Sequence, residues 1–217
     1  MYKVVCVIVA ATVCWTVCTY GQSEAGFPNL SGPYLGQEPP GKEFQPFAPG
    51  MGFGDILNAP TFSPDGDEAY WATRNGIVVS KMAEGRWTEP AFVSFSGTGN
   101  RPFYDDAPVI SPDNKRLYFT SRRPISYQTP NQYHIWYVER TSLGWSEPRP
   151  LPEIINSTPG LEHWQLSISD SGTLYFSVFK ENGHVIHFSN LADGEYTVPK
   201  QLDAVSSFGM TKCPFIA

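Results

Sequence analysis

Ala59–Gly66 reads APTFSPDG and is followed at once by the aromatic run Glu68–Ala72, which reads EAYWA. In Ser-Pro-Asp-Gly, proline fixes its own φ, aspartate can bond to backbone amides of the turn, and glycine supplies a positive φ. An apolar run, a tight turn and an aromatic run in this order predict two antiparallel strands joined by a hairpin.

The same order of residues returns twice, in Ala107–Thr120 (APVISPDNKRLYFT) and Gln165–Ser177 (QLSISDSGTLYFS), and the aligned serines lie 48 and 58 residues apart. Periods of about 50 residues with four strand-like runs in each unit predict the blades of a β-propeller. Each unit ends in an aromatic residue close to a proline. These aromatics are expected to pack between blades, with carbohydrate stacking as the alternative; they are Trp87, Trp145 and Tyr196.

Turn dipeptides such as Asn75-Gly76 favour two-residue hairpin turns and place the strands within each unit. The second unit carries an insertion, Arg122–Gln132, with two prolines and no apolar alternation, which we interpret as a surface loop. The strands of the first unit are predicted near 58–62, 68–73, 77–81 and 86–92.

Ser-Pro-Asp-Gly followed by an aromatic strand resembles the WD40-like PD40 repeat of TolB-type β-propellers. The later Gly-x-Trp-Thr/Ser-Glu-Pro element is similar to one found in many exported bacterial proteins with this repeat. The resemblance covers residues 57–217, with Asn114 in place of glycine and Asp170-Ser171 in place of Pro-Asp as departures. It implies an all-β propeller of four-stranded antiparallel blades, at about 57–95, 105–151 and 163–203.

The last residues, 211–217, align with the first strand of a fourth unit, because Cys213–Ala217 matches Ala59–Ser63. Propeller blades bury their faces by closing into a ring. We therefore expect a partial propeller of three blades and one further strand. The alternative is a small closed ring in which the segment before the repeats completes a fourth blade.

The first 21 residues differ from the repeats at 53–217. Lys3 precedes the apolar run Val4–Val17, and small and polar residues follow, which is the pattern of a secretory signal peptide. An uncleaved N-terminal anchor is the alternative. Residues 22–52 form a Pro/Gly-rich leader that wraps the domain or links it to the signal peptide. The mature protein is then secreted or periplasmic, with no further membrane span and with Cys213 as its one cysteine.

The 217-residue chain has a formal net charge of −6 and no basic run, so a nucleic-acid partner is not expected. It has no Gly-x-Ser-x-Gly elbow, phosphate loop or Cys-x-x-Cys pair. His184 and His187 are three apart on a predicted strand, so they point to opposite faces, while His134 and His163 belong to other units. No metal or cofactor is expected.

One constellation of polar residues remains. In propellers of this kind the first strand of each blade lines the central channel, so the residues just before it lie at one mouth. Two carboxylates among them could serve glycoside chemistry if their spacing were suitable. We predict a ligand-binding mouth, with ordinary solvation of a loop rim as the alternative; its residues are Asn58, Asp105, Asp106, Glu162, His163 and Lys212.

These features predict a non-enzymatic binding or scaffold protein that holds a protein, peptide or glycan on one propeller face. Because propellers also host enzymes, the alternative is an exported hydrolase or lyase acting on glycans or peptides.

Overall fold

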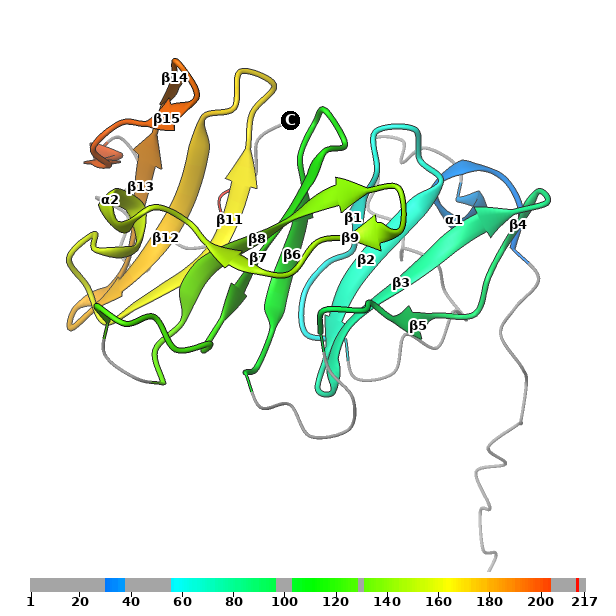
Figure 1. Ribbon diagram of the computed structural model, residues 1–217, viewed down its shortest axis with the longest axis horizontal. Coiled ribbons are helices and arrows are strands. Elements are labelled where there is room, and N and C mark those ends of the chain that lie inside the picture. Colours follow the sequence, from blue (N-terminus) through cyan, green and yellow to red (C-terminus); the bar gives the residue numbers. More distant parts are fainter. Residues whose placement is uncertain (1–29, 38–55, 97–102, 129–130, 204–213, 215–217) are drawn as a thin grey trace, which may run out of the picture.

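The computed structural model describes residues 30–37, 56–96, 103–128, 131–203 and 214. Three larger antiparallel sheets stand side by side in chain order (Figure 1), and β14 and β15 form a separate two-stranded sheet. The chain is all-β with blades of the β-propeller type, as its repeats predict. The segment 1–21, most of the leader and nearly all of 211–217 lie outside the described residues.

In each blade three antiparallel strands pair in chain order, and they are followed by a short, divided outer strand. Blade one contains β1 (Thr61–Phe62), β2 (Glu68–Thr73), β3 (Gly76–Ala83), β4 (Arg86–Trp87) and β5 (Ala91–Phe92). Blade two contains β6 (Asp106–Ile110), β7 (Arg116–Ser121), β8 (His134–Thr141), β9 (Gly144–Trp145) and β10 (Arg149–Pro150). Blade three contains β11 (Glu162–Ile168), β12 (Leu174–Lys180), β13 (Gly183–Ser189), β14 (Leu191–Ala192), β15 (Glu195–Tyr196) and β16 (Lys200–Gln201).

The outer strand predicted as one piece near 86–92 is two pieces. β4 pairs with the far end of β3, and β5 pairs with its middle. Pro90 lies between them, and because proline has no backbone N–H it interrupts the ladder at this edge.

The turn after each first strand is held by its serine. The backbone amide of Glu68 donates to Ser63 Oγ at 2.9 Å, and the amide of Arg116 donates to Ser111 Oγ at 2.9 Å. Asn114 takes the position of Gly66 with φ 58°, which asparagine tolerates better than most residues. The departure from glycine therefore leaves the turn intact.

Neighbouring aromatics on the second strands point to opposite faces, as predicted. Tyr70 belongs to the apolar cluster between blades one and two, whereas Trp71 lies in the cluster on the outer face of blade one. Phe119 faces blade one and Tyr118 faces blade three. Blade two therefore buries both of its faces between its neighbours.

The described part of the leader, residues 30–37, packs on the outer face of blade one. α1 (Pro33–Gly36) is a single turn in which Leu35 is fully buried. The Trp87 indole N–H donates to the carbonyl oxygen of Gly32 at 2.8 Å. The backbone amide of Trp87 donates to the carbonyl oxygen of Leu30 at 2.9 Å. The indole predicted to pack between blades thus packs against the leader instead.

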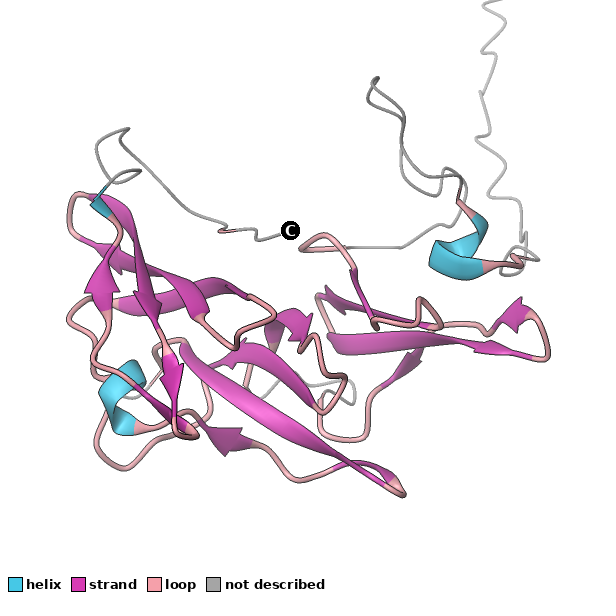
Figure 2. Ribbon diagram, turned by 90° about the horizontal axis from the view of Figure 1, so that it is seen from above, coloured by secondary structure: helices cyan, strands magenta, loops and turns pink. Residues whose placement is uncertain are grey.

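α1 and α2 (Glu153–Asn156) lie at opposite ends of the array in Figure 2. The insertion Arg122–Gln132 is only partly a surface loop, because Ile125 joins the core between blades one and two and Arg123 is largely buried. None of the described helices has the length and apolar character needed to cross a membrane.

Candidate functional site

The first strands all begin on one side of the array, which we call the mouth side; it is the lower edge in Figure 1. A chain of hydrogen bonds crosses the three blades there. Asn58 donates from Nδ2 to Asp106 Oδ1 at 2.5 Å and accepts at Oδ1 from Gln165 Nε2 at 2.8 Å. The three side chains are half-buried, so they form a polar connection at the edge of solvent.

Two β-bulges turn these side chains toward one another. The pairing of β6 with β7 shifts between Asp106 and Val109, where Ala107 has φ 48° and its amide donates to Asp106 Oδ1 at 2.7 Å. The pairing of β11 with β12 shifts between Trp164 and Leu166, which leaves Gln165 in the bulge. Bulges re-aim side chains and occur often beside functional sites.

Asp105 is buried in an ion pair. Its Oδ1 accepts a hydrogen bond from Nη1 of Arg123, and its Oδ2 accepts one from Nη2 at 3.0 Å. The side chains of Asp105 and Arg123 are 4% and 11% exposed. Arg123 also donates to the carbonyl oxygen of Phe95 at 2.6 Å and lies 5.2 Å from the ring centre of Phe119. The inserted loop is thereby fixed to the interface between blades one and two.

Glu162 is also paired. Its Oε1 accepts from Arg122 Nη2 at 3.2 Å, and the guanidinium of Arg122 lies 4.4 Å from the ring centre of Tyr133 and 5.4 Å from that of Tyr104. The pair is partly open to solvent, with side-chain exposures of 34% for Arg122 and 20% for Glu162. Asp105, Asp106 and Glu162 thus each have a cation or an amide as partner.

His163 is buried beside His134. Their ring centroids are 5.5 Å apart, and both residues line a pocket of about 200 Å³ on the mouth side. Burial, followed by the neighbouring His134, lowers the pKa of His163 to about 3. Burial also lowers the pKa of His134. Both rings are therefore neutral at pH 7.

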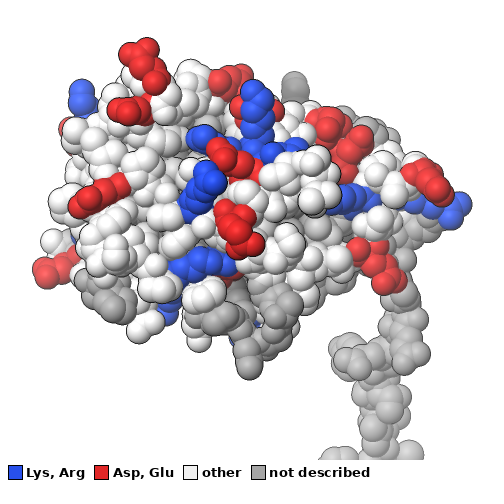
Figure 3. All heavy atoms as spheres, viewed as in Figure 1, with Lys and Arg blue, Asp and Glu red and all other residues white. Residues whose placement is uncertain are grey.

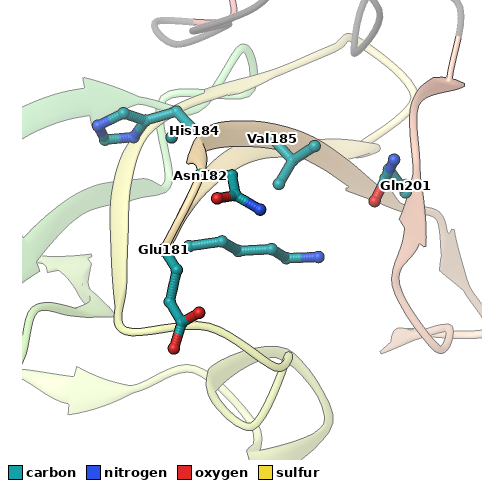
Figure 4. Close-up of a pocket in the computed structure, with 7 residues that line it drawn as sticks. Glu181, Asn182, His184, Val185 and Gln201 are labelled. Atoms are coloured by element: carbon teal, nitrogen blue, oxygen red, sulfur yellow. The ribbon is translucent and has the colours of Figure 1, made fainter.

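A wider hollow lies at the tip of the β12–β13 hairpin (Figure 4). It has a volume of about 480 Å³ and is formed by Lys180–Val185 together with Gln201 of β16. The ring of His184 points away from Val185 in this view, toward Trp164 and Phe179. His187 lies on the opposite face, against Phe176, as its spacing from His184 predicts.

Charges are mixed rather than gathered by sign on the face seen in Figure 3. Ion pairs explain much of this mixture. Arg140 Nη2 lies 2.6 Å from Glu68 Oε2 across the first two blades, and Arg116 Nη2 lies 3.0 Å from Glu139 Oε1 within blade two.

The structure thus brings Asn58 and Asp106 together and places Asp105, Glu162 and His163 nearby in separate contacts. Lys212 lies outside the described residues. Sequence reasoning missed Gln165, which aligns with Ala59 and Ala107; a polar residue where two repeats have alanine was the available signal. It also missed the meeting of His134 with His163, because their contact depends on how two blades pack.

The chain was compared with protein-family models, with curated protein sequences and with solved structures, and only solved structures match it. No protein-family model matches it, and no curated protein matches it in sequence. A protein from Agrobacterium tumefaciens assigned as TolB is 19% identical with a TM-score of 0.46, over 65% of this chain and 47% of its own. TolB from Acinetobacter baumannii is 18% identical with a TM-score of 0.44, over 70% of this chain and 34% of its own. The Kuenenia stuttgartiensis hydrazine synthase is 16% identical with a TM-score of 0.42, over 66% of this chain and 36% of its own. The chain therefore matches less than half of the length of each of these structures.

Proposed function

We propose that this chain is an exported, non-enzymatic β-propeller module that binds a protein, peptide or glycan on its mouth side. The hydrogen-bonded chain of Asn58, Asp106 and Gln165 carries this proposal, because it combines one polar residue from each blade. Asn58 precedes β1, Asp106 begins β6, and Gln165 lies in the bulge of β11. Export is supported by the apolar run Val4–Val17 that follows Lys3.

The surroundings of this chain suit recognition. Exposed apolar side chains accompany the polar residues on the mouth side, among them Leu57 at 41%, Tyr104 at 48% and Leu161 at 44% exposure. Amphipathic rings beside fixed amides and carboxylates are the usual means of holding a peptide or a sugar in one orientation. The Arg122–Glu162 pair lends the rim rigidity, because the guanidinium is fixed by the rings of Tyr104 and Tyr133.

A direct test uses the purified chain on glycan and peptide arrays, followed by titration of each captured compound. Asp106→Asn keeps the shape of the side chain but removes its charge. We expect it to weaken binding at least about tenfold, which corresponds to 1.4 kcal/mol. The matched control is Asp170→Asn, since Asp170 is exposed at the β11–β12 turn on the opposite side.

Binding that is equally sensitive to Asp170→Asn, or insensitive to Asp106→Asn, would place the ligand elsewhere. Conversion of a captured glycan or peptide, seen by mass spectrometry, would favour a hydrolase or lyase instead.

A further inference from the structure

Two histidines from different blades face each other near the mouth side. His134 begins β8 in blade two, and His163 is the second residue of β11 in blade three. Their ring centroids are 5.5 Å apart, with the planes inclined by 41°, and each residue is 3% exposed. The backbone supports this approach, because the amide of His163 donates to the carbonyl oxygen of Tyr133 at 2.9 Å.

All four ring nitrogens of the pair are buried, and none has a hydrogen-bond partner of standard geometry among the described residues. Leaving a buried polar atom unpaired is unfavourable, so a ligand that pairs with these nitrogens would be stabilising.

The chemistry of the pair suits a metal ion. Imidazole binds a metal ion through the lone pair of one ring nitrogen, and two such rings lie side by side here. With Zn–N bonds of about 2.0–2.1 Å, two imidazoles on one tetrahedral ion have ring centroids about 5 Å apart. The observed separation of 5.5 Å is close to that value.

We propose that His134 and His163 form a two-imidazole site for a divalent first-row transition metal ion such as Zn²⁺. The pocket of about 200 Å³ beside the rings also has Gln132 and Thr158 in its walls, so water or side-chain oxygens can complete the coordination. Within the described parts of the chain, no group of three His, Cys, Asp or Glu side chains is arranged for a metal. The proposed site therefore has two imidazoles as its protein ligands.

The test starts from the whole chain treated with EDTA and then titrated with Zn²⁺. The chain has four histidines, so ring ¹⁵N NMR can follow each of them. We expect Zn²⁺ to shift the ring nitrogens of His134 and His163 and to raise the melting temperature. This measurement on the unaltered chain does not depend on any variant folding.

Variants locate the site. His134→Asn and His163→Asn should each weaken Zn²⁺ binding in calorimetry by at least about tenfold, the lower end of losses seen when a metal site loses even a supporting group. The matched control is His184→Asn, since His184 lies on the other face of blade three, and it should bind as the unaltered chain does. Shifts confined to His184 and His187, no response to Zn²⁺, or unchanged affinity in both site variants would overturn the proposal.

Discussion

The indole ring of Trp145 packs edge-on against the phenol ring of Tyr70, with ring centroids 6.0 Å apart. Trp145 lies on β9 near the end of blade two, and Tyr70 lies on the second strand of blade one. One blade further on, the hydroxyl groups of Tyr196 and Tyr118 lie 3.4 Å apart. The aromatic residue that closes each of these units therefore packs on the unit before it.

The stacked blades predict a large cost for emptying their interface. Phe119 is fully buried between blades one and two, and its ring centroid lies 5.2 Å from that of Phe95. Phe119→Ala should lower the free energy of unfolding by about 3–5 kcal/mol in denaturant melts. Leu143→Ala is the control, because Leu143 is 97% exposed and its truncation should cost less than about 0.5 kcal/mol. A loss below about 1 kcal/mol for Phe119→Ala would contradict close packing of the blades.

The ion pair between blades one and two should give a measurable pH dependence. Burial alone would raise the pKa of Glu68, but hydrogen bonds from Arg140, Lys81 and Tyr70 outweigh it and lower the pKa from 4.5 to about 2. Because the folded-state pKa lies below the unfolded value, this stabilisation is present above about pH 4.5 and disappears as the pH falls toward 2.

Glu68→Gln should therefore cost about 2 kcal/mol at pH 7 and much less at pH 3, measured by denaturant melts at both values. Glu84→Gln, at an exposed turn, should leave the free energy of unfolding unchanged at both pH values. A cost for Glu68→Gln that stays constant between pH 7 and pH 3 would mean that the charge of Glu68 does not stabilise the interface.

The buried pair of Asp105 and Arg123 should show strong coupling in a double-mutant cycle. Removing one partner leaves an uncompensated buried charge, so Asp105→Leu or Arg123→Met alone should each cost about 3–5 kcal/mol. The double variant should cost less than the sum of the two changes, because neither charge then remains. Lys115→Met is the exposed control, since the Lys115 side chain is 80% exposed in its pair with Asp113. Additive losses would show that the two side chains do not interact.

Asn156 should be essential for the connection that leads into blade three. Its Oδ1 accepts from the amide of Ile135 at 2.9 Å, and its Nδ2 donates to the carbonyl oxygens of Ile135 and Leu151 at 3.0 and 3.1 Å. Asn156→Ala leaves buried backbone groups unpaired and should cost about 2–4 kcal/mol. Gln128→Ala removes bonds to the same segment from a less buried side chain and should cost much less. Equal losses in thermal melts would refute this ranking.

The repeats predicted the local structure well, because strand alternation and turn residues are properties of neighbouring positions. The hairpin after Ser63 and the opposite directions of Tyr70 and Trp71 follow from a few residues each. The hydrogen bond between Asn58 and Asp106 likewise joins residues that the repeats place at corresponding ends of neighbouring first strands.

Contacts that depend on blade packing were not predictable. The inserted loop contains Arg123, but nothing in its sequence shows that the carboxylate of Asp105 lies within reach. Gln165 reaches Asn58 only because a bulge rotates one residue of β11. The pairing of His134 and His163 likewise requires the relative placement of two blades.

The leader gives the array a direction. On the side where a preceding blade would receive Trp87, Leu35 and the carbonyl oxygen of Gly32 already occupy that role. A further blade packed on this face would have to displace α1 first, whereas the face of blade three turned away from blade two carries Tyr175 and Phe188, stacked with centroids 6.2 Å apart. Among the described residues, the two outer faces of the array therefore differ: segment 30–37 packs on the face of blade one, and the face of blade three carries a stacked aromatic pair.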